Sequence, residues 1–150
     1  MKDIDRLLKN IQSINIDSIL YEIWGIGMVQ DYIIELNTEG EATSQLYMLG
    51  EDSDGNKLGQ YSNYTKIVKG SKGQKTDFIT LKDTGDFYNT FRVIAKSKGF
   101  EIVANPVKDN DNLFDEFGEN IVGLNKKNQE LLIEFIMPLF LERLEKRILQ

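Results

Sequence analysis

The sequence contains no cysteine and no histidine among its 150 residues. Without cysteine the chain forms no disulfide and offers no thiolate to a zinc site, so a reducing compartment is allowed but not demanded. Without histidine it lacks the commonest general base and the usual partner of a serine or cysteine nucleophile. An enzyme of this composition would have to work with Asp, Glu, Lys, Tyr, Ser or Thr, and we expect no cofactor and no metal.

Long uninterrupted apolar runs are also missing. The N-terminus, MKDIDRLLKN, alternates charged and apolar residues and lacks the apolar centre of a secretory signal. The longest apolar-rich run, 131–141, is interrupted by Glu134 and Pro138 and is too short to cross a bilayer. We therefore expect no membrane association and a protein that begins its life in the cytosol of its producing cell.

Positive charge is in the minority. The 18 Lys and Arg residues oppose 24 Asp and Glu residues, which gives a net charge of -6. Because contacts to phosphate need clustered Lys and Arg, we expect no specific recognition of nucleic acid. With 41% hydrophobic and 28% charged residues, the chain is typical of a folded globular protein, and its length predicts a single domain over 1–150.

The apolar pattern predicts an α+β fold with N-terminal helices, a small and mostly antiparallel sheet, and a long C-terminal helix. Helical spacing predicts helices over 4–14 and 17–36, broken near SINID and kinked near Gly25 and Gly27. Alternation predicts a strand over 76–81. FRVIA and FEIVA, separated by KSKG, predict a β-hairpin that turns at Gly99.

The remaining segments predict short helices and turns. Residues 37–50 predict a turn and a short helix with Leu46 and Leu49 inward, and 62–70 fit a helical turn or a strand. Thr84 is a candidate N-cap for a short helix, and LFDEFGEN predicts a helix that ends at Gly118. The last helix is expected to start after an Asn125 cap, run to about residue 149 and kink at Pro138.

Two motifs resemble ligand loops but fail on spacing. A calcium loop starting at Asp52 would need Gly sixth and Glu twelfth, where the chain has Lys57 and Asn63, so DSDGN predicts a turn with exposed carboxylates. DNDN at 109–112 fails in the same way. In GSKGQKT, Gln74 interrupts the Gly-Lys-Thr succession that a phosphate loop requires, so we predict no nucleotide binding.

The C-terminal helix is apolar around almost its whole circumference, whereas a surface helix carries one stripe. Two interpretations stay open: the helix lies in the centre of the core, or part of it meets copies of the same chain. For the second, the contact is expected at the centre of the apolar run: Phe135, Ile136, Leu139 and Phe140.

The segment over 61–91, YSNYTKIVKGSKGQKTDFITLKDTGDFYNTF, resembles the shared segment of phage virion-morphogenesis, or tail-completion, proteins. In that family a Ser-Pro and a Thr precede a basic segment, and a Leu-x-Asp-Thr-Gly-x-Leu-x-x-Ser element follows. Asn63 stands where the family has Pro. The residues that carry the resemblance are Ser62, Thr65, Lys66, Lys69, Leu81, Asp83, Thr84 and Gly85, with Phe87 in place of Leu and Thr90 in place of Ser.

The resemblance covers about a fifth of the chain and implies a non-enzymatic virion protein, a homo-oligomeric ring component of the head–tail connector (neck) or tail-completion complex. Its implied partners are other neck, portal or tail proteins, and its implied location is the virion, after assembly in the host cytoplasm. Within the element, Asp-Thr-Gly is expected to act as a turn and helix cap. The alternative is a small acidic metal-dependent hydrolase that uses carboxylates such as Asp115, Glu116 and Glu119.

Overall fold

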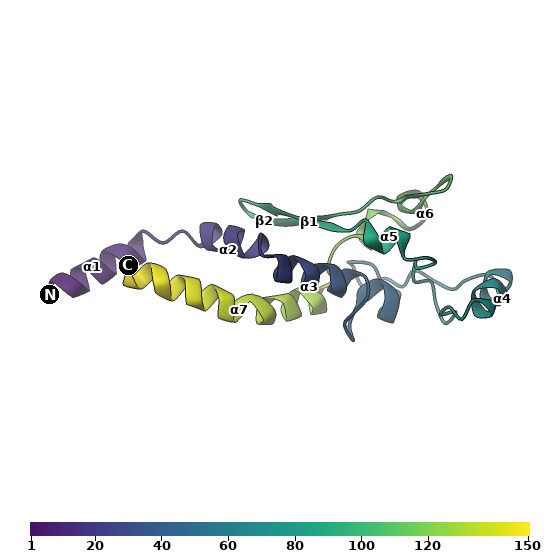
Figure 1. Ribbon diagram of the computed structural model, residues 1–150, viewed down its shortest axis with the longest axis horizontal. Helices are drawn as coiled ribbons and strands as arrows, with labels where there is room; N and C mark the ends of the chain where they lie inside the picture. Colours follow the sequence, from purple (N-terminus) through teal and green to yellow (C-terminus); the bar gives the residue numbers. More distant parts are fainter.

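The longest element of the structure, a computed structural model that describes residues 1–150, is the C-terminal helix α7 (Lys126–Leu149). Three helices lie along it, and both chain termini are at the same end of an elongated molecule (Figure 1). They are α1 (Lys2–Gln12), α2 (Ile16–Trp24) and α3 (Gly27–Asn37). No helix of the chain combines the length and apolar character that a membrane span requires.

A β-hairpin covers the opposite side of α2 and α3 from α7. Strand β1 (Arg92–Lys96) pairs antiparallel with β2 (Gly99–Val103), and Lys96 faces Gly99 at the turn. A second, two-residue pair joins β3 (Val107–Lys108) to β4 (Asp111–Asn112). The predicted α+β fold, with antiparallel pairing and a hairpin at Gly99, is confirmed.

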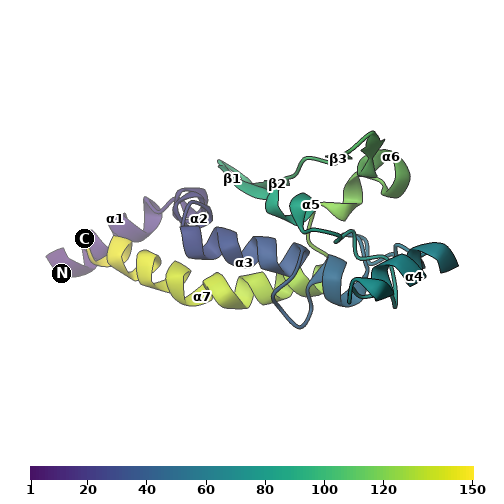
Figure 2. The same ribbon diagram turned by 45° about the vertical axis from the view of Figure 1, so that its right-hand side comes forward.

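The end of the molecule away from α1 is built from short elements. Figure 2 shows α4 at this far end and α6 near the tip of the second strand pair. The short elements are the π-helix η1 (Gln45–Leu49), α4 (Asn63–Ser71), α5 (Asp86–Asn89), α6 (Leu113–Phe117) and the 3-10 turn η2 (Glu119–Ile121). Residues 62–70, which fitted either a helical turn or a strand, thus form mainly a helix.

Two apolar clusters hold these elements together. The larger lies between α2, α3, α7 and the hairpin, where the rings of Trp24 and Phe100 lie 4.8 Å apart between centroids. The smaller lies under α5, where the ring centroids of Phe87 and Phe91 are 5.1 Å apart. Leu46 of η1 is fully buried in this second cluster, as predicted.

Between the clusters lies a buried network of side-chain amides. Asn128, at the start of α7, donates to the backbone carbonyls of Leu36 and Thr43 at 3.1 and 2.9 Å. It also donates to Gln45 Oε1, which accepts the backbone N–H of Asn125 at 2.7 Å. These amides are buried, so an unfilled donor or acceptor among them would cost free energy without access to water.

The same network extends to η2 and the loop before α7. Gln45 Nε2 donates to the carbonyl of Gly123, and Asn37 accepts from the Gly123 N–H, both at 2.7 Å. Asn37 also donates to the carbonyl of Ile121 at 3.1 Å. The C-terminus of α3, η1, η2 and the start of α7 therefore meet at one fixed point.

Helix boundaries follow the local signals in most places. Asn15 caps α2 by accepting from the Ser18 N–H, and Asn125 caps α7 as predicted. The helix expected over 17–36 is two helices, because the chain breaks at Gly25 between α2 and α3. Helix α7 continues through Pro138, where a kink was predicted.

The prediction of a strand over 76–81 is wrong. Its alternating pattern has no neighbouring strand to pair with, and Leu81 has a left-handed φ of 61°. The Ile79 N–H instead donates to the carbonyl of Gly59 at 2.9 Å, and the Thr80 N–H donates to the Tyr61 hydroxyl at 3.0 Å. The segment is an irregular chain held against residues 58–61.

Helix α7 divides its apolar residues between two rows. Leu132 and Ile136 lie in the core, and Phe135, Leu139 and Phe140 pack against it, half-buried. Four residues expected at a subunit contact thus pack within the chain. The row one position further along is exposed instead: Ile133, Met137 and Leu141.

Helix α1 contributes no residue to either apolar cluster. None of its residues is buried, although Ile4, Leu7, Leu8 and Ile11 share the predicted apolar face. Its fixed points are on the end of α7, where Asn10 Nδ2 donates to the carbonyls of Ile148 and Gln150 at 3.0 and 2.8 Å.

We predict that Asn128→Leu lowers the free energy of unfolding by about 3 kcal/mol, because the substitution keeps the volume but leaves two backbone carbonyls and the Gln45 oxygen without their donor. Denaturant unfolding measures the effect. The matched control is Asn63→Leu at an exposed position, expected to change stability by under about 0.5 kcal/mol. Equal stabilities of the two variants would contradict a structural role for the network.

Candidate functional site

The residues of the family-like motif form one structural unit at the junction of α4 and α5. Ser62 caps α4: its Oγ accepts the Thr65 N–H at 3.1 Å and donates to Thr65 Oγ1 at 2.8 Å. Thr90 closes the other end, donating to the carbonyl of Phe87 and accepting the Asn105 N–H. Phe87 is buried in the second apolar cluster.

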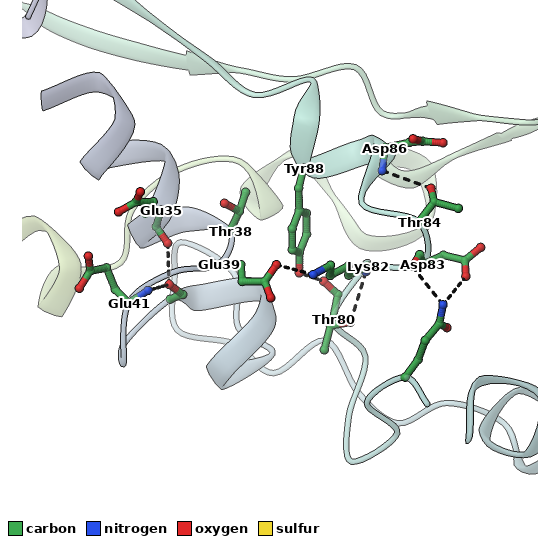
Figure 3. Close-up of polar contacts among 12 residues, drawn as sticks. Glu35, Thr38, Glu39, Glu41, Thr80, Lys82, Asp83, Thr84, Asp86 and Tyr88 are labelled. Carbon is green, nitrogen blue, oxygen red and sulfur yellow. Dashed lines mark hydrogen bonds and ion pairs between the residues drawn. The ribbon is translucent and has the colours of Figure 1, made fainter. Parts of the chain in front are cut away.

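The Asp-Thr-Gly triplet turns the chain into α5, as its residue types predict. Gly85 has φ of 92°, a conformation that favours glycine, and it is the N-cap residue itself. Thr84, the predicted N-cap, lies one residue before the observed cap, and its Oγ1 accepts the Asp86 N–H at 3.3 Å. Figure 3 shows this turn beside Asp83.

The Asp83 carboxylate binds other side chains and does not cap the backbone of α5. Its Oδ1 accepts from Gln74 Nε2 at 3.0 Å, and the same nitrogen donates to the Asp83 carbonyl (Figure 3). Lys108 and Lys72 lie 3.4 and 3.8 Å from the carboxylate. The hydrogen bond from Gln74, then the charges of Lys108 and Lys72, hold the pKa of Asp83 below its ordinary value.

Thr80 anchors the irregular segment through two tyrosines. The Tyr88 hydroxyl donates to the Thr80 carbonyl, and the Tyr61 hydroxyl lies 3.3 Å from Thr80 Oγ1 (Tyr88 and Thr80 in Figure 3). Burial, then the charge of Glu39, raises the pKa of Tyr88 far above its ordinary value, so its hydroxyl stays protonated. The tyrosine serves as a permanent donor.

These residues border a pocket of about 410 Å³, here named the motif pocket. It is open to solvent between α4, the 79–83 segment, β3 and α6. Its polar lining comprises Gln60, Tyr61, Ser62, Thr65, Lys69, Lys82, Asp83, Lys108 and Glu116, and its apolar lining includes Leu81. Five residues of the resemblance therefore line it: Ser62, Thr65, Lys69, Leu81 and Asp83.

Lys69 is the least exposed charge of the motif pocket, with 7% of its surface accessible. Its Nζ donates to the Lys82 carbonyl at 2.9 Å and lies 4.8 Å from the centroid of the Tyr61 ring. Lys82 in turn donates to Glu39 (Figure 3). The lysines thus tie α4 to the 79–83 segment and that segment to the loop after α3.

The chemistry of the motif pocket is that of a rigid junction. Lys82, Asp83 and Lys108 are each paired with another side chain of the chain, and the phenol that lines the pocket, that of Tyr61, accepts the backbone N–H of Thr80. No group of three or more Asp or Glu side chains lies together where it could hold a metal ion. Asp115, Glu116 and Glu119 lie on the exposed side of α6 and η2.

The two ligand-like loops have structural roles. Asp52 accepts the N–H groups of Asp54 and Asn56, both at 2.9 Å, which makes DSDGN a turn as predicted. Its carboxylate is buried, however, because these bonds replace water. Lys75 lies 4.5 Å from the centroid of the Phe78 ring, so the lysine of the phosphate-loop-like segment packs on an aromatic residue.

Several residues of the site have no sequence signal of their own. In the sequence, Gln74 is notable only because it interrupts the phosphate-loop spacing. In the structure, it is the main partner of Asp83. The Tyr61, Thr80 and Tyr88 contacts join positions 19 and 8 residues apart, a spacing that neither helical nor strand periodicity predicts. Lys69 counted as part of a basic segment, and nothing indicated that it would be buried.

We predict that the stabilising effect of Asp83 is lost in acid. Because its pKa is lowered in the folded state, the ionised carboxylate stabilises the fold above its ordinary pKa of 3.8, and this contribution disappears as pH falls through the lowered value. The difference in unfolding free energy between the natural chain and Asp83→Asn should therefore shrink from about pH 6 to about pH 2.

Carboxyl titration by NMR gives a direct measurement, in which Gln74→Leu should raise the pKa of Asp83 towards its ordinary value. Asp77→Asn, at an exposed position, is the control for stability. A stability difference for Asp83→Asn that is independent of pH would show that the side chain acts through packing alone.

Tyr88→Phe is expected to cost about 1–3 kcal/mol of stability, because it leaves the buried Thr80 carbonyl without its donor. Tyr64→Phe is the matched control, since Tyr64 is 77% exposed and should change stability by under about 0.5 kcal/mol. Thermal or denaturant unfolding of the two variants compares them. Identical unfolding midpoints for the two variants would show that the Tyr88 hydroxyl does not stabilise the junction.

Comparison of this chain with protein-family models, with curated proteins and with solved structures finds no match.

Proposed function

We propose that the chain is a structural virion protein of a tailed phage, a ring component of the head–tail connector or tail-completion complex. The resemblance of residues 61–91 to the virion-morphogenesis proteins supplies the phage assignment. In support, the matched residues act together as one junction: Ser62 caps α4 by accepting from Thr65, Gly85 turns the chain into α5, and Phe87 is buried beneath it. A short motif whose residues build one junction can recur within a family as a single structural unit.

The structural observation that carries the assembly part of the proposal is the amount of exposed surface. The chain exposes 9288 Å², against about 7,800 Å² for a compact monomer of its mass. The excess of roughly 1,500 Å² is close to two contacts of the usual 800 Å² per partner. A ring member needs two such contacts, one for each neighbour.

Apolar rows on two helices point the same way. The exposed row of α7 comprises Ile133, Met137 and Leu141, and α1 exposes Ile4, Leu8 and Ile11. Each of these side chains is between 42% and 54% exposed. Burying such rows against other copies would remove apolar surface from water at about 25 cal/mol per Å². The partners in the proposal are copies of this chain and the adjoining portal, neck or tail proteins.

No comparable structural observation supports the hydrolase alternative. The carboxylates at 115, 116 and 119 are exposed and form no group of metal-binding size. We therefore propose a role in assembly and no catalysis.

A nonsense mutation in the encoding phage tests the role in assembly. In a non-suppressing host we expect infectivity to fall by several orders of magnitude and unjoined heads and tails to accumulate in electron micrographs. A suppressing host should restore joined particles, in which mass spectrometry finds the chain at a fixed copy number per portal. Intact infectious particles that lack the chain would refute the proposal.

A further inference from the structure

Helix α4 presents an unpartnered face at the far end of the molecule (Figures 1 and 2). Tyr64 and Ile67, one turn apart, are 77% and 72% exposed. Lys66 flanks them without an ion pair, and Lys72 follows with only the 3.8 Å contact to Asp83. Residues 60–76 contain four lysines and no acidic residue, in a chain whose net charge is -6.

A second surface, on α3 and α7, has the opposite charge. A pocket of about 610 Å³, here named the acidic pocket, is lined by Gly27, Met28, Asp31, Tyr32, Glu35, Glu41 and Phe135. Its base is the stacked pair of Tyr32 and Phe135, whose ring centroids lie 4.1 Å apart. Met28, at its rim, is 57% exposed.

The three carboxylates of the acidic pocket have no cation of their own. None of Asp31, Glu35 and Glu41 takes part in any ion pair of the chain. Burial, then the charges of Glu41 and Asp31, raises the pKa of Glu35, which reports the same crowding of negative charge. A partner that brings cations beside apolar groups would relieve it.

We propose that α4 of one copy docks on the acidic pocket of the next copy. Tyr64 and Ile67 would cover Met28 and the stacked rings, and Lys66 and Lys72 would meet the carboxylates. The occupant follows from charge complementarity, because an apolar and basic helix face and an apolar and acidic pocket occur on the same chain. The inference rests on the proposed ring and names its contact.

The geometry suits a ring better than a symmetric dimer. The two surfaces lie on different elements, with α4 beyond the end of α3 in Figure 1, so a contact between them is head-to-tail. After the first contact the pair of copies keeps one free surface of each kind, and repeated contacts close a ring or extend a filament. Lys69 stays on the inner face of α4 and is not part of the contact.

A charge exchange tests the contact. Lys66→Glu with Lys72→Glu, and separately Glu35→Lys with Glu41→Lys, should each weaken self-association at least about tenfold by sedimentation or light scattering. An equal mixture of the two variants should assemble again, because each then meets a complementary partner. Lys96→Glu with Lys98→Glu at the turn of the β-hairpin makes the same charge change away from every proposed contact and should leave association unchanged.

Cross-linking gives a second measurement that does not disturb the folded core. Since the chain has no cysteine, Ile67→Cys and Met28→Cys each supply one thiol at an exposed position. Mild oxidation of the mixed variants should give a covalent dimer far in excess of either variant alone. The chain with both substitutions should give multimers larger than a dimer.

The outcomes separate this contact from the proposed function. If the natural chain assembles but the charge variants associate normally, or their mixture stays apart, the contact is wrong and the ring proposal stands. Cross-linked homodimers of a single variant, or a bridge within one chain, would also overturn the contact. A natural chain that remains monomeric at low salt and high concentration, and yields no cross-link, would count against both.

Discussion

The buried amides around Asn128 are the constraint on which the two ends of the molecule depend. The Asn128 amide donates hydrogen bonds to the last turn of α3, to the loop before η1 and to Gln45. Gln45 in turn donates to Gly123, in the segment that leads into α7. Apolar contacts alone would allow these segments to shift relative to one another, because the hydrophobic effect favours burial but has no preferred direction or partner. Directional bonds in a dry environment allow one arrangement, because any other leaves polar groups unpaired. The helical body and the junction of short elements consequently have a defined relation.

Beyond this fixed point the chain relies on polar contacts more than on a continuous core. The segment from 58 to 83 forms no sheet, and its path is determined by tyrosine hydroxyls, by Lys69 and by the pairing of Gln74 with Asp83. Such a junction holds α4 away from the body while leaving its outer face free. In the same region the molecule departs most from a compact shape, and the family-like motif lies there.

Local signals predicted much of the fold, and long-range pairings account for what they missed. The hairpin at Gly99, the helix break near SINID and the cap at Asn125 depend on neighbouring residues, so their patterns were sufficient. Residues 76–81 alternate like a strand, but a strand also needs a partner, and only the folded chain shows that none is present. Gln45 and Asn128 are separated by 83 residues, and nothing in the pattern of either segment pairs them. Of the candidate site, the turn at Gly85 was predictable from residue type, whereas the burial of Lys69 depended on tertiary packing.

The weak attachment of α1 implies an uneven distribution of stability along the molecule. Local opening costs least where few apolar groups are buried, and α1 is held chiefly by the edge of α7 and by one amide that spans two terminal carbonyls. Its backbone amides should therefore exchange with solvent long before those of α2 and α3, and the last turn of α7 should exchange with them. An end that opens without unfolding the body can adjust its angle to whatever surface it meets, so imperfect symmetry in an assembly would be absorbed there and not in the core.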